Sequence, residues 1–135
     1  MDQKKIVDAL NLIKPPFNVN GIAQLAAADS LKDKKFIAKS IKHNLYYARN
    51  IKKFLEKYSI YSNAVSANFL LLNFEKCKYS AKFLYEKLKN KGIILRSTED
   101  GYNIKNKLRL TIGSKKENLK LMSTIKRVLK KWKIF

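Results

Sequence analysis

The sequence is poor in the residues that build several familiar kinds of site. Its 135 residues include one cysteine, one histidine, four glycines and two prolines. Cys77 cannot form an internal disulfide and has no cysteine or histidine neighbour at metal-ligand spacing, which favours a structural thiol. The sequence contains no glycine-rich phosphate loop, zinc-ligand cluster or Ser/His/Asp arrangement, and its ten carboxylates form no evident pair. We therefore expect neither a metal site nor one of the common hydrolytic sites.

Long hydrophobic runs are also missing. No stretch approaches the roughly 20 apolar residues that span a membrane. The N-terminal segment MDQKKIVDAL carries charges where a signal peptide would have its apolar core. We therefore expect a cytoplasmic protein with no membrane partner. Its length and its hydrophobic content of 46% suffice for an apolar core without disulfide or metal support.

Basic residues are abundant, and the formal net charge is +20. Such a charge is typical of proteins that bind nucleic acid or anionic membrane surfaces. However, only four of the 30 basic residues are arginines, and the 26 lysines are spread over nearly every segment. Nucleic-acid readers favour arginine and gather basic charge on one face. We therefore attribute the charge to A/T-rich codon usage and disfavour nucleic acid as a partner. A stand-alone basic module that binds nucleic acid non-specifically remains the alternative.

Apolar residues three and four positions apart predict helices in the first part of the chain. A short helix over residues 4–13 should end at Pro15 and Pro16, and Asn18 or Asn20 can cap the helix that follows. A long helix is expected from about residue 33 to residue 58, because its apolar stripe comprises Ile37, Ile41, Leu45, Ala48, Ile51, Leu55 and Tyr58.

His43 and Asp33 belong to this long helix. Asp33 is a favourable first-turn anion. His43 has no carboxylate or nucleophile partner nearby in the sequence, so we expect it to face solvent.

The second half of the sequence predicts short strands that alternate with helices. An apolar strand is expected over 68–74, a helix over 78–90 stopped by Gly92, and a strand over 93–95 that ends on Arg96. The loop STEDGYNIKN should lead into a strand over 107–113. A final helix from 115 to about 131 should cover the sheet with the stripe Leu119, Met122, Ile125, Val128, Leu129 and Trp132. The fold class is therefore α/β (α+β layer), with a small mixed or antiparallel sheet of about three strands packed on helices.

Two arginines stand at strand ends, Arg96 and Arg109. If their strands pair antiparallel, the intervening loop brings both guanidinium groups to one pocket, where they would bind a carboxylate or phosphate. The alternative is that each arginine pairs with a local acid such as Glu99 or Asp100. The residues alone leave these two interpretations open.

Four segments give the chain a wider resemblance. They occur in the order and spacing seen in the C-terminal part of histidinol-phosphate aminotransferases, which belong to the class I/II aminotransferases and use pyridoxal 5'-phosphate. The segments are PPFNVNGIAQLAAADSL, ANFLLLNF, GIILR and KLRLTIGSKKEN. The resemblance extends from about Ile6 to Val128. It implies that residues 33–135 form the small C-terminal domain and that residues 1–32 are helices connecting it to a large domain.

The resemblance also implies a set of substrate-binding residues. Arg109 would bind the acidic group of the substrate. Arg96 would be a second ligand, for the phosphate of histidinol phosphate or a carboxylate of glutamate. Asn18 would lie near the active-site mouth. The implied activity is amino transfer in histidine biosynthesis, between glutamate/2-oxoglutarate and a phosphorylated amino substrate.

The chain also departs from this family. None of its lysines stands in the motif of the Schiff-base lysine that holds pyridoxal 5'-phosphate. We therefore expect no catalytic or cofactor-binding residue in this chain, and no covalent cofactor or activity of the chain alone. We expect a C-terminal fragment or split-gene piece whose large domain is missing and which forms a homodimer when complete. The segments STEDGYNIKN and SKKEN differ from the family pattern, which leaves the exact substrate open.

Overall fold

The computed structural model describes residues 3–15, 19–65 and 67–131 of the chain, without the side chains of residues 100, 101 and 131. The chain divides into two compact units, Met1–Ala38 and Lys39–Phe135, and each is described by itself. No helix in the described ranges is both long and apolar enough to cross a membrane.

The first unit contains two helices, α1 (Gln3–Ile13) and α2 (Gly21–Lys32). Both were predicted. Asn20 caps α2, because its Oδ1 accepts a hydrogen bond of 2.8 Å from the Ile22 backbone N–H, while the alternative cap Asn18 lies outside the described residues. Neither helix has a buried residue. Large apolar side chains are therefore exposed on both helices, among them Ile6, Val7, Leu10, Ile22, Leu25 and Leu31.

Helix α3 (Lys34–Glu56) begins in the first unit and continues into the second. Asp33 stabilises its start by accepting a hydrogen bond of 2.9 Å from the Phe36 backbone N–H. Only the C-terminal half of the predicted stripe is buried. Ala48, Ile51 and Leu55 are at most 1% exposed, whereas Ile37, Ile41 and Leu45 are exposed.

The second unit is built on a four-stranded antiparallel sheet in the order β1-β2-β4-β3. Its strands are β1 (Tyr61–Ser62), β2 (Phe69–Asn73), β3 (Arg96–Ser97) and β4 (Lys107–Thr111). The fold class and the small antiparallel sheet are confirmed. The two-residue strand β1 was not predicted.

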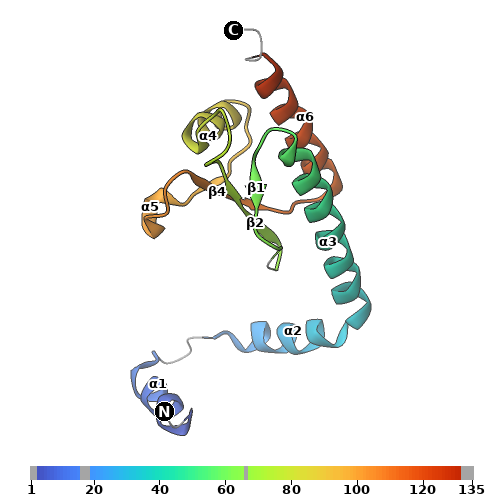
Figure 1. Cartoon of the computed structure of the whole chain (residues 1–135). Helices are drawn as coiled ribbons and strands as arrows, with labels where there is room; N and C mark the ends of the chain where they lie inside the picture. The colour runs from blue at the N-terminus through green and yellow to red at the C-terminus, as the bar shows by residue number, and fades with distance from the viewer. Residues whose placement is uncertain (1–2, 16–18, 66, 132–135) are drawn as a thin grey trace. The chain divides into compact units, whose positions relative to one another are not determined.

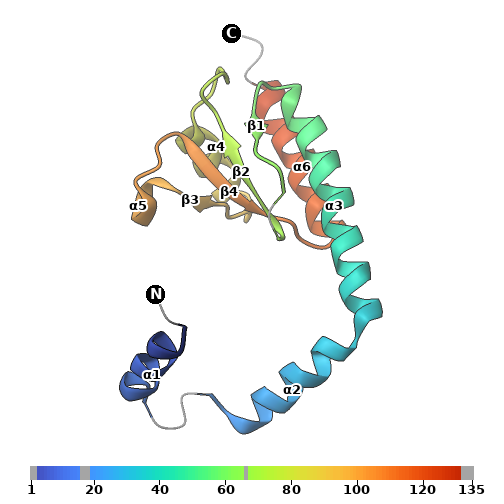
Figure 2. The ribbon, with the colours of Figure 1, turned by 60° about the horizontal axis from the view of Figure 1, so that its bottom comes forward.

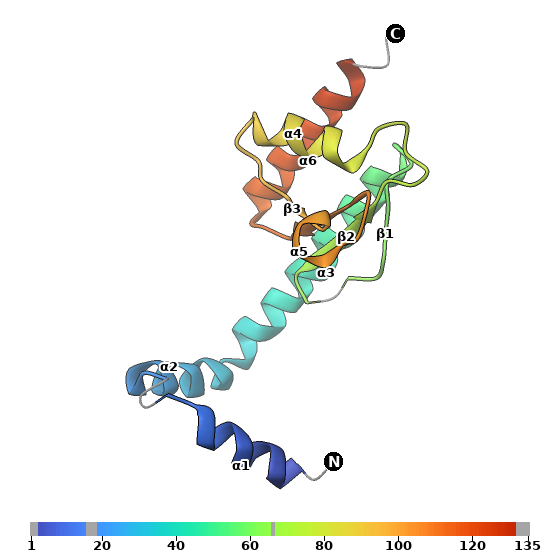
Figure 3. The same ribbon diagram turned by 90° about the vertical axis from the view of Figure 1, so that its left-hand side faces the viewer.

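The side chains of β2 and β4 alternate between two faces. Leu70, Leu72, Leu108 and Leu110 are at most 2% exposed and form the core together with buried residues of α3, α4 (Ala81–Lys89) and α6 (Lys115–Lys131). Figures 1 and 2 show α3 and α6 running alongside each other next to the sheet, and Figure 3 shows α4 beside α6. The opposite face carries residues that are half-buried or exposed: Phe69, Leu71, Arg109 and Thr111.

The prediction of a strand over residues 93–95 is wrong. The strand β3 begins at Arg96, the residue at which the predicted strand was to end. The end of α4 explains the difference. Gly92 has a left-handed φ of 69°, and the Ile93 N–H donates to the Leu88 carbonyl. This closure uses the backbone of residue 93 to cap the helix, as in a Schellman-type ending, so the sheet starts only later.

The loop after β3 contains a short helix that was also missed, α5 (Glu99–Tyr102). Ser97 Oγ accepts from the Glu99 N–H, and Asn103, at a φ of 51°, ends the turn by donating to the Glu99 carbonyl. Thr98 is 4% exposed, and its Oγ1 hydroxyl has the carbonyls of both Ile104 and Lys107 within hydrogen-bonding distance for its one proton. The loop is therefore a hydrogen-bonded structure and holds Tyr102 in a defined position.

The final helix α6 was predicted correctly in extent. Its buried residues include Ile125, Val128 and Leu129 of the expected stripe. Leu119 is 50% exposed and Leu121 is buried instead. Trp132 lies outside the described residues.

Candidate anion-binding site

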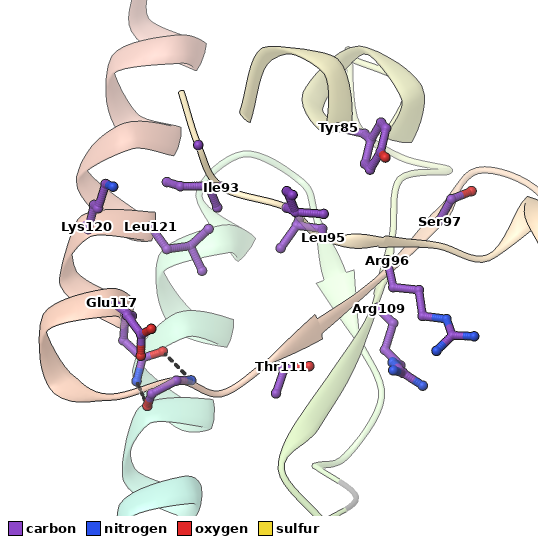
Figure 4. A pocket seen from close by; sticks show the side chains of 14 residues that line it. Tyr85, Ile93, Leu95, Arg96, Ser97, Arg109, Thr111, Glu117, Lys120 and Leu121 are labelled. Carbon is purple, nitrogen blue, oxygen red and sulfur yellow. Dashed lines mark hydrogen bonds between the residues drawn. The ribbon is translucent and has the colours of Figure 1, made fainter. Parts of the chain in front are cut away.

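Arg96 and Arg109 are direct partners across the antiparallel pair β3 and β4. The antiparallel pairing that a shared pocket requires is therefore present. Both residues line one pocket of about 730 Å³, and Figure 4 shows their side chains next to each other and extending the same way. Strand pairing alone brings the two positive charges together, since residues opposite each other lie on one face of the sheet.

Arg109 is half-buried, and one of its hydrogen-bond donors has no acceptor among the described residues. Its Cζ lies 5.4 Å from the centroid of the Phe69 ring. Its Nε is buried and has no hydrogen-bond partner among the described residues. A buried donor without an acceptor costs about 1–3 kcal/mol. Arg109 therefore keeps one unsatisfied donor in the free chain.

Arg96 is more exposed. Its Cζ lies 5.5 Å from the centroid of the Tyr102 ring, which α5 provides. Each guanidinium group therefore has one aromatic ring beside it. Strand β2 provides the ring for Arg109, and α5 provides the ring for Arg96.

Neither arginine forms an ion pair with a local acid among the described side chains. The ion pairs Lys32–Asp29 and Lys107–Glu75, for example, involve neither of them. Glu99 accepts from the Asn106 backbone N–H instead, and the Asp100 side chain is outside the described set. Like charges directly opposite each other across two strands destabilise the pair. An anion bound between them would remove that repulsion.

Gly113 and Asn118 also line the pocket, and neither was a predicted site residue. The Gly113 N–H donates to Asn118 Oδ1 over 3.0 Å, and Asn118 Nδ2 donates to the Gly113 carbonyl over 2.8 Å. His43 Nε2 lies 2.9 Å from the same carbonyl and donates to it. The expectation that His43 faces solvent is therefore wrong. His43 is half-buried beside the turn between β4 and α6, and its ring centroid lies 4.7 Å from that of Tyr47.

The same turn is a capping box, in which a Ser and a Glu three residues apart cap each other's backbone. The Ser114 N–H donates to Glu117 Oε2 over 2.8 Å, and the Glu117 N–H donates to Ser114 Oγ. The Ser114 hydroxyl, and then its backbone N–H, hold the pKa of Glu117 below its usual value. The spacing Ser-x-x-Glu after a strand was the sequence signal that could have identified this cap.

The other predicted residues add little to the pocket. Asn18 lies outside the described residues, so its placement near the active-site mouth stays a prediction. No cluster of three or more His, Cys, Asp or Glu side chains suited to a metal occurs in the described ranges. Cys77 is half-buried and accepts a hydrogen bond from the Tyr79 N–H.

The sequence model of the family described as aminotransferase class I and II matches residues 2–125, and the chain belongs to that family. Within it, the chain is 62% identical over 125 residues to the histidinol-phosphate aminotransferase of Pelagibacter ubique (strain HTCC1062), in a match that covers 93% of this chain and 35% of that protein. It is 34% identical to the enzyme of the same name from Campylobacter hominis, covering 93% of this chain and 34% of that one.

The structural comparison agrees with the sequence comparison. The fold matches the crystal structure of the histidinol-phosphate aminotransferase from Clostridium acetobutylicum with a TM-score of 0.80 and 26% identity, covering 93% of this chain and 38% of that chain. The resemblance stated from the sequence is confirmed. The chain spans about a third of the length of these relatives. None of these matches supports the nucleic-acid-binding alternative.

Proposed function

We propose that this chain is the substrate-binding part of a histidinol-phosphate aminotransferase, in which Arg96 and Arg109 hold the anionic groups of the substrates. The observation that carries the proposal is the direct cross-strand pairing of the two arginines in one pocket, with no acidic partner among the described side chains. The 62% identity to a histidinol-phosphate aminotransferase supports the choice of substrate class.

The chemistry of the arginine pair suits such substrates. A guanidinium group presents a planar fork of N–H donors that matches the oxygens of a phosphate or carboxylate. Half-burial of Arg109 strengthens its interaction with an anion, since charges in a partly dry site are less screened. Arg96 supplies a second fork beside it. A phosphorylated amino substrate and glutamate or 2-oxoglutarate both carry groups that this pair can bind.

The cofactor of the family needs a lysine that this pocket does not offer. Pyridoxal 5'-phosphate, when bound, supplies an electron sink for chemistry at the substrate's α-carbon. Lys120, the lysine among the pocket residues, is exposed on α6, whereas lysines that act as nucleophiles are commonly desolvated. Lys120 does not fit that role. We therefore place the covalent anchor in another part of the complete enzyme.

The same proposal covers the organisation of the complete protein. Residues 33–135 would be the small domain and residues 1–32 the helices that connect it to a large domain. The exposed apolar residues of α1 and α2 support this, because such surface is normally covered. We propose a cytoplasmic homodimer acting in histidine biosynthesis, on the strength of the family relationship.

A chimeric enzyme tests the function. This chain would replace the matching third of the Pelagibacter ubique relative, and amino transfer between glutamate and the phosphorylated substrate would be measured. We expect an active chimera. Replacing Arg109 by alanine should lower kcat/KM by roughly 10- to 150-fold, which corresponds to about 1.5–3 kcal/mol for one charge-assisted interaction.

Arg49→Ala is the matched control, because it removes an exposed arginine that does not line the pocket. It should leave kcat/KM within about twofold, given the small worth of exposed charges. A folded, cofactor-loaded chimera without amino transfer, or one that is indifferent to Arg109→Ala, would contradict the proposed function.

A further inference from the structure

We propose that Phe69 and Tyr102 are positioning residues of the anion site, each fixing one of the two arginines by presenting an aromatic ring to its guanidinium group. The inference rests on the proposed function and adds two residues to that site. Neither ring is needed to make the site positively charged. Each would act through its arginine.

The register of the sheet explains the first pair. Phe69 is opposite Thr111, and Leu71 is opposite Arg109. Phe69 and Arg109 are therefore diagonal neighbours on one face, at a separation that long and aromatic side chains can bridge. The guanidinium carbon lies 5.4 Å from the ring centroid, within the range of a cation–π contact. Nε of Arg109 is buried and has no described hydrogen-bond partner, so the Phe69 ring contributes a contact that does not depend on that donor.

The second pair depends on the loop between β3 and β4. Tyr102 is the last residue of α5, and its ring centroid lies 5.5 Å from Arg96 Cζ. The loop is fixed by the Thr98 hydroxyl and by Glu99, which accepts from the Asn106 N–H. Tyr102 is 53% exposed. The hydrogen bonds of the loop therefore set the position of the Tyr102 ring, and the ring is not part of the hydrophobic core.

Fixing the arginines has a direct consequence for affinity. Ordering a long side chain on binding costs about 0.5–1.5 kcal/mol, which is about 2- to 10-fold in Kd. An arginine already held against a ring avoids part of that cost. Arg109 is half-buried and Arg96 is exposed, which predicts that Arg109 is the more rigid ligand and that Arg96 is the more adjustable one.

The test is the affinity of the chain for inorganic phosphate at about 0.15 M salt, measured by calorimetry or NMR titration. Phe69→Leu and Tyr102→Leu should each raise Kd by about 2- to 10-fold. Phe69→Tyr and Tyr102→Phe, which keep the ring, should stay within about twofold of the unmodified chain. In the Arg109→Ala background, Phe69→Leu should have no further effect, and in the Arg96→Ala background the same should hold for Tyr102→Leu.

A general structural role for the rings predicts different results. Loss of affinity that persists in the matching arginine-to-alanine background would overturn the inference, as would unchanged Kd in folded leucine variants. Should Phe69→Leu fail to fold, Tyr102→Leu carries the test, because its side chain is exposed. Phosphate binding that depends on the arginines but not on the rings overturns this inference alone. Binding that is indifferent to both arginines overturns the anion site as well.

Discussion

Asn118 binds both backbone groups of Gly113, accepting from its N–H and donating to its carbonyl. Asn118 is 1% exposed, although asparagine is seldom buried to this degree. The two hydrogen bonds join the end of β4 to the first turn of α6. They therefore fix the direction in which the chain leaves the strand that carries Arg109.

Asn118→Ala should destabilise the second unit by about 1–3 kcal/mol, because the Gly113 N–H loses its acceptor and the carbonyl keeps only His43. Chemical denaturation followed by circular dichroism measures the change. Asn50→Ala, on an exposed position of α3, is the control and should change stability by less than about 0.5 kcal/mol. Equal effects of the two substitutions would show that the Asn118 bonds do not matter.

Gly113→Ala should be destabilising for a steric reason. A Cβ at this position would lie 2.8 Å from Glu117 Oε2 and 3.1 Å from Glu117 Cβ. Glu117 would have to move and give up its cap on Ser114, at a cost of about 0.5–2 kcal/mol. Gly21→Ala is the matched control, since nothing lies within 4 Å of a Cβ there. A stability loss for Gly113→Ala that is undiminished in a Glu117→Ala background would contradict this explanation.

Stability at low pH should depend on Glu117. Its folded-state pKa is lowered by the Ser114 hydroxyl and backbone N–H. A carboxylate with a lowered pKa stabilises the fold above its unfolded pKa, about 4.3, and this contribution disappears as the pH falls through the folded pKa. Glu117→Gln keeps an acceptor but does not titrate, so its unfolding midpoint should fall less steeply below about pH 4.5. Parallel curves for the two proteins would exclude the effect.

The five longer helices, all but α5, and the two long strands were predictable because their signals are local. Residues 115–131 show helical periodicity in the sequence, and β2 and β4 are short apolar segments beside turn-forming residues. The start of β3 could not be predicted in this way. Ile93 to Leu95 are ideal strand residues, but the preceding helix takes the Ile93 N–H for its own closure. The local closure of the preceding helix overrode the intrinsic strand preference of these residues.

The candidate site was predictable in part. Two arginines at strand ends indicated an anion site, and antiparallel pairing places them opposite each other. His43 could not be interpreted correctly from its own helix, because its partner Gly113 is 70 residues away in the sequence. The contacts of the Phe69 and Tyr102 rings with the arginines were not predicted for a related reason. Phe69 is far from Arg109 in the sequence, and although Tyr102 is close to Arg96 in the sequence, its contact depends on the fold of the loop that contains α5.

The central claim is that the Arg96–Arg109 pair is the anion site of this chain. The most direct measurement is a phosphate titration followed by the arginine side-chain Nε–Hε signals in NMR. The sequence has only four arginines, so each signal can be assigned by substitution. Arg49 and Arg127 do not line the pocket and serve as internal controls.

The account predicts saturable shifts of the Arg96 and Arg109 signals, with Arg49 and Arg127 little changed. The Arg109 Nε–Hε signal should show the larger change, because its guanidinium group is half-buried and its charge is less screened by water than that of the exposed Arg96. Shifts distributed evenly over the four arginines would contradict the account, because they would indicate diffuse binding by a highly charged surface.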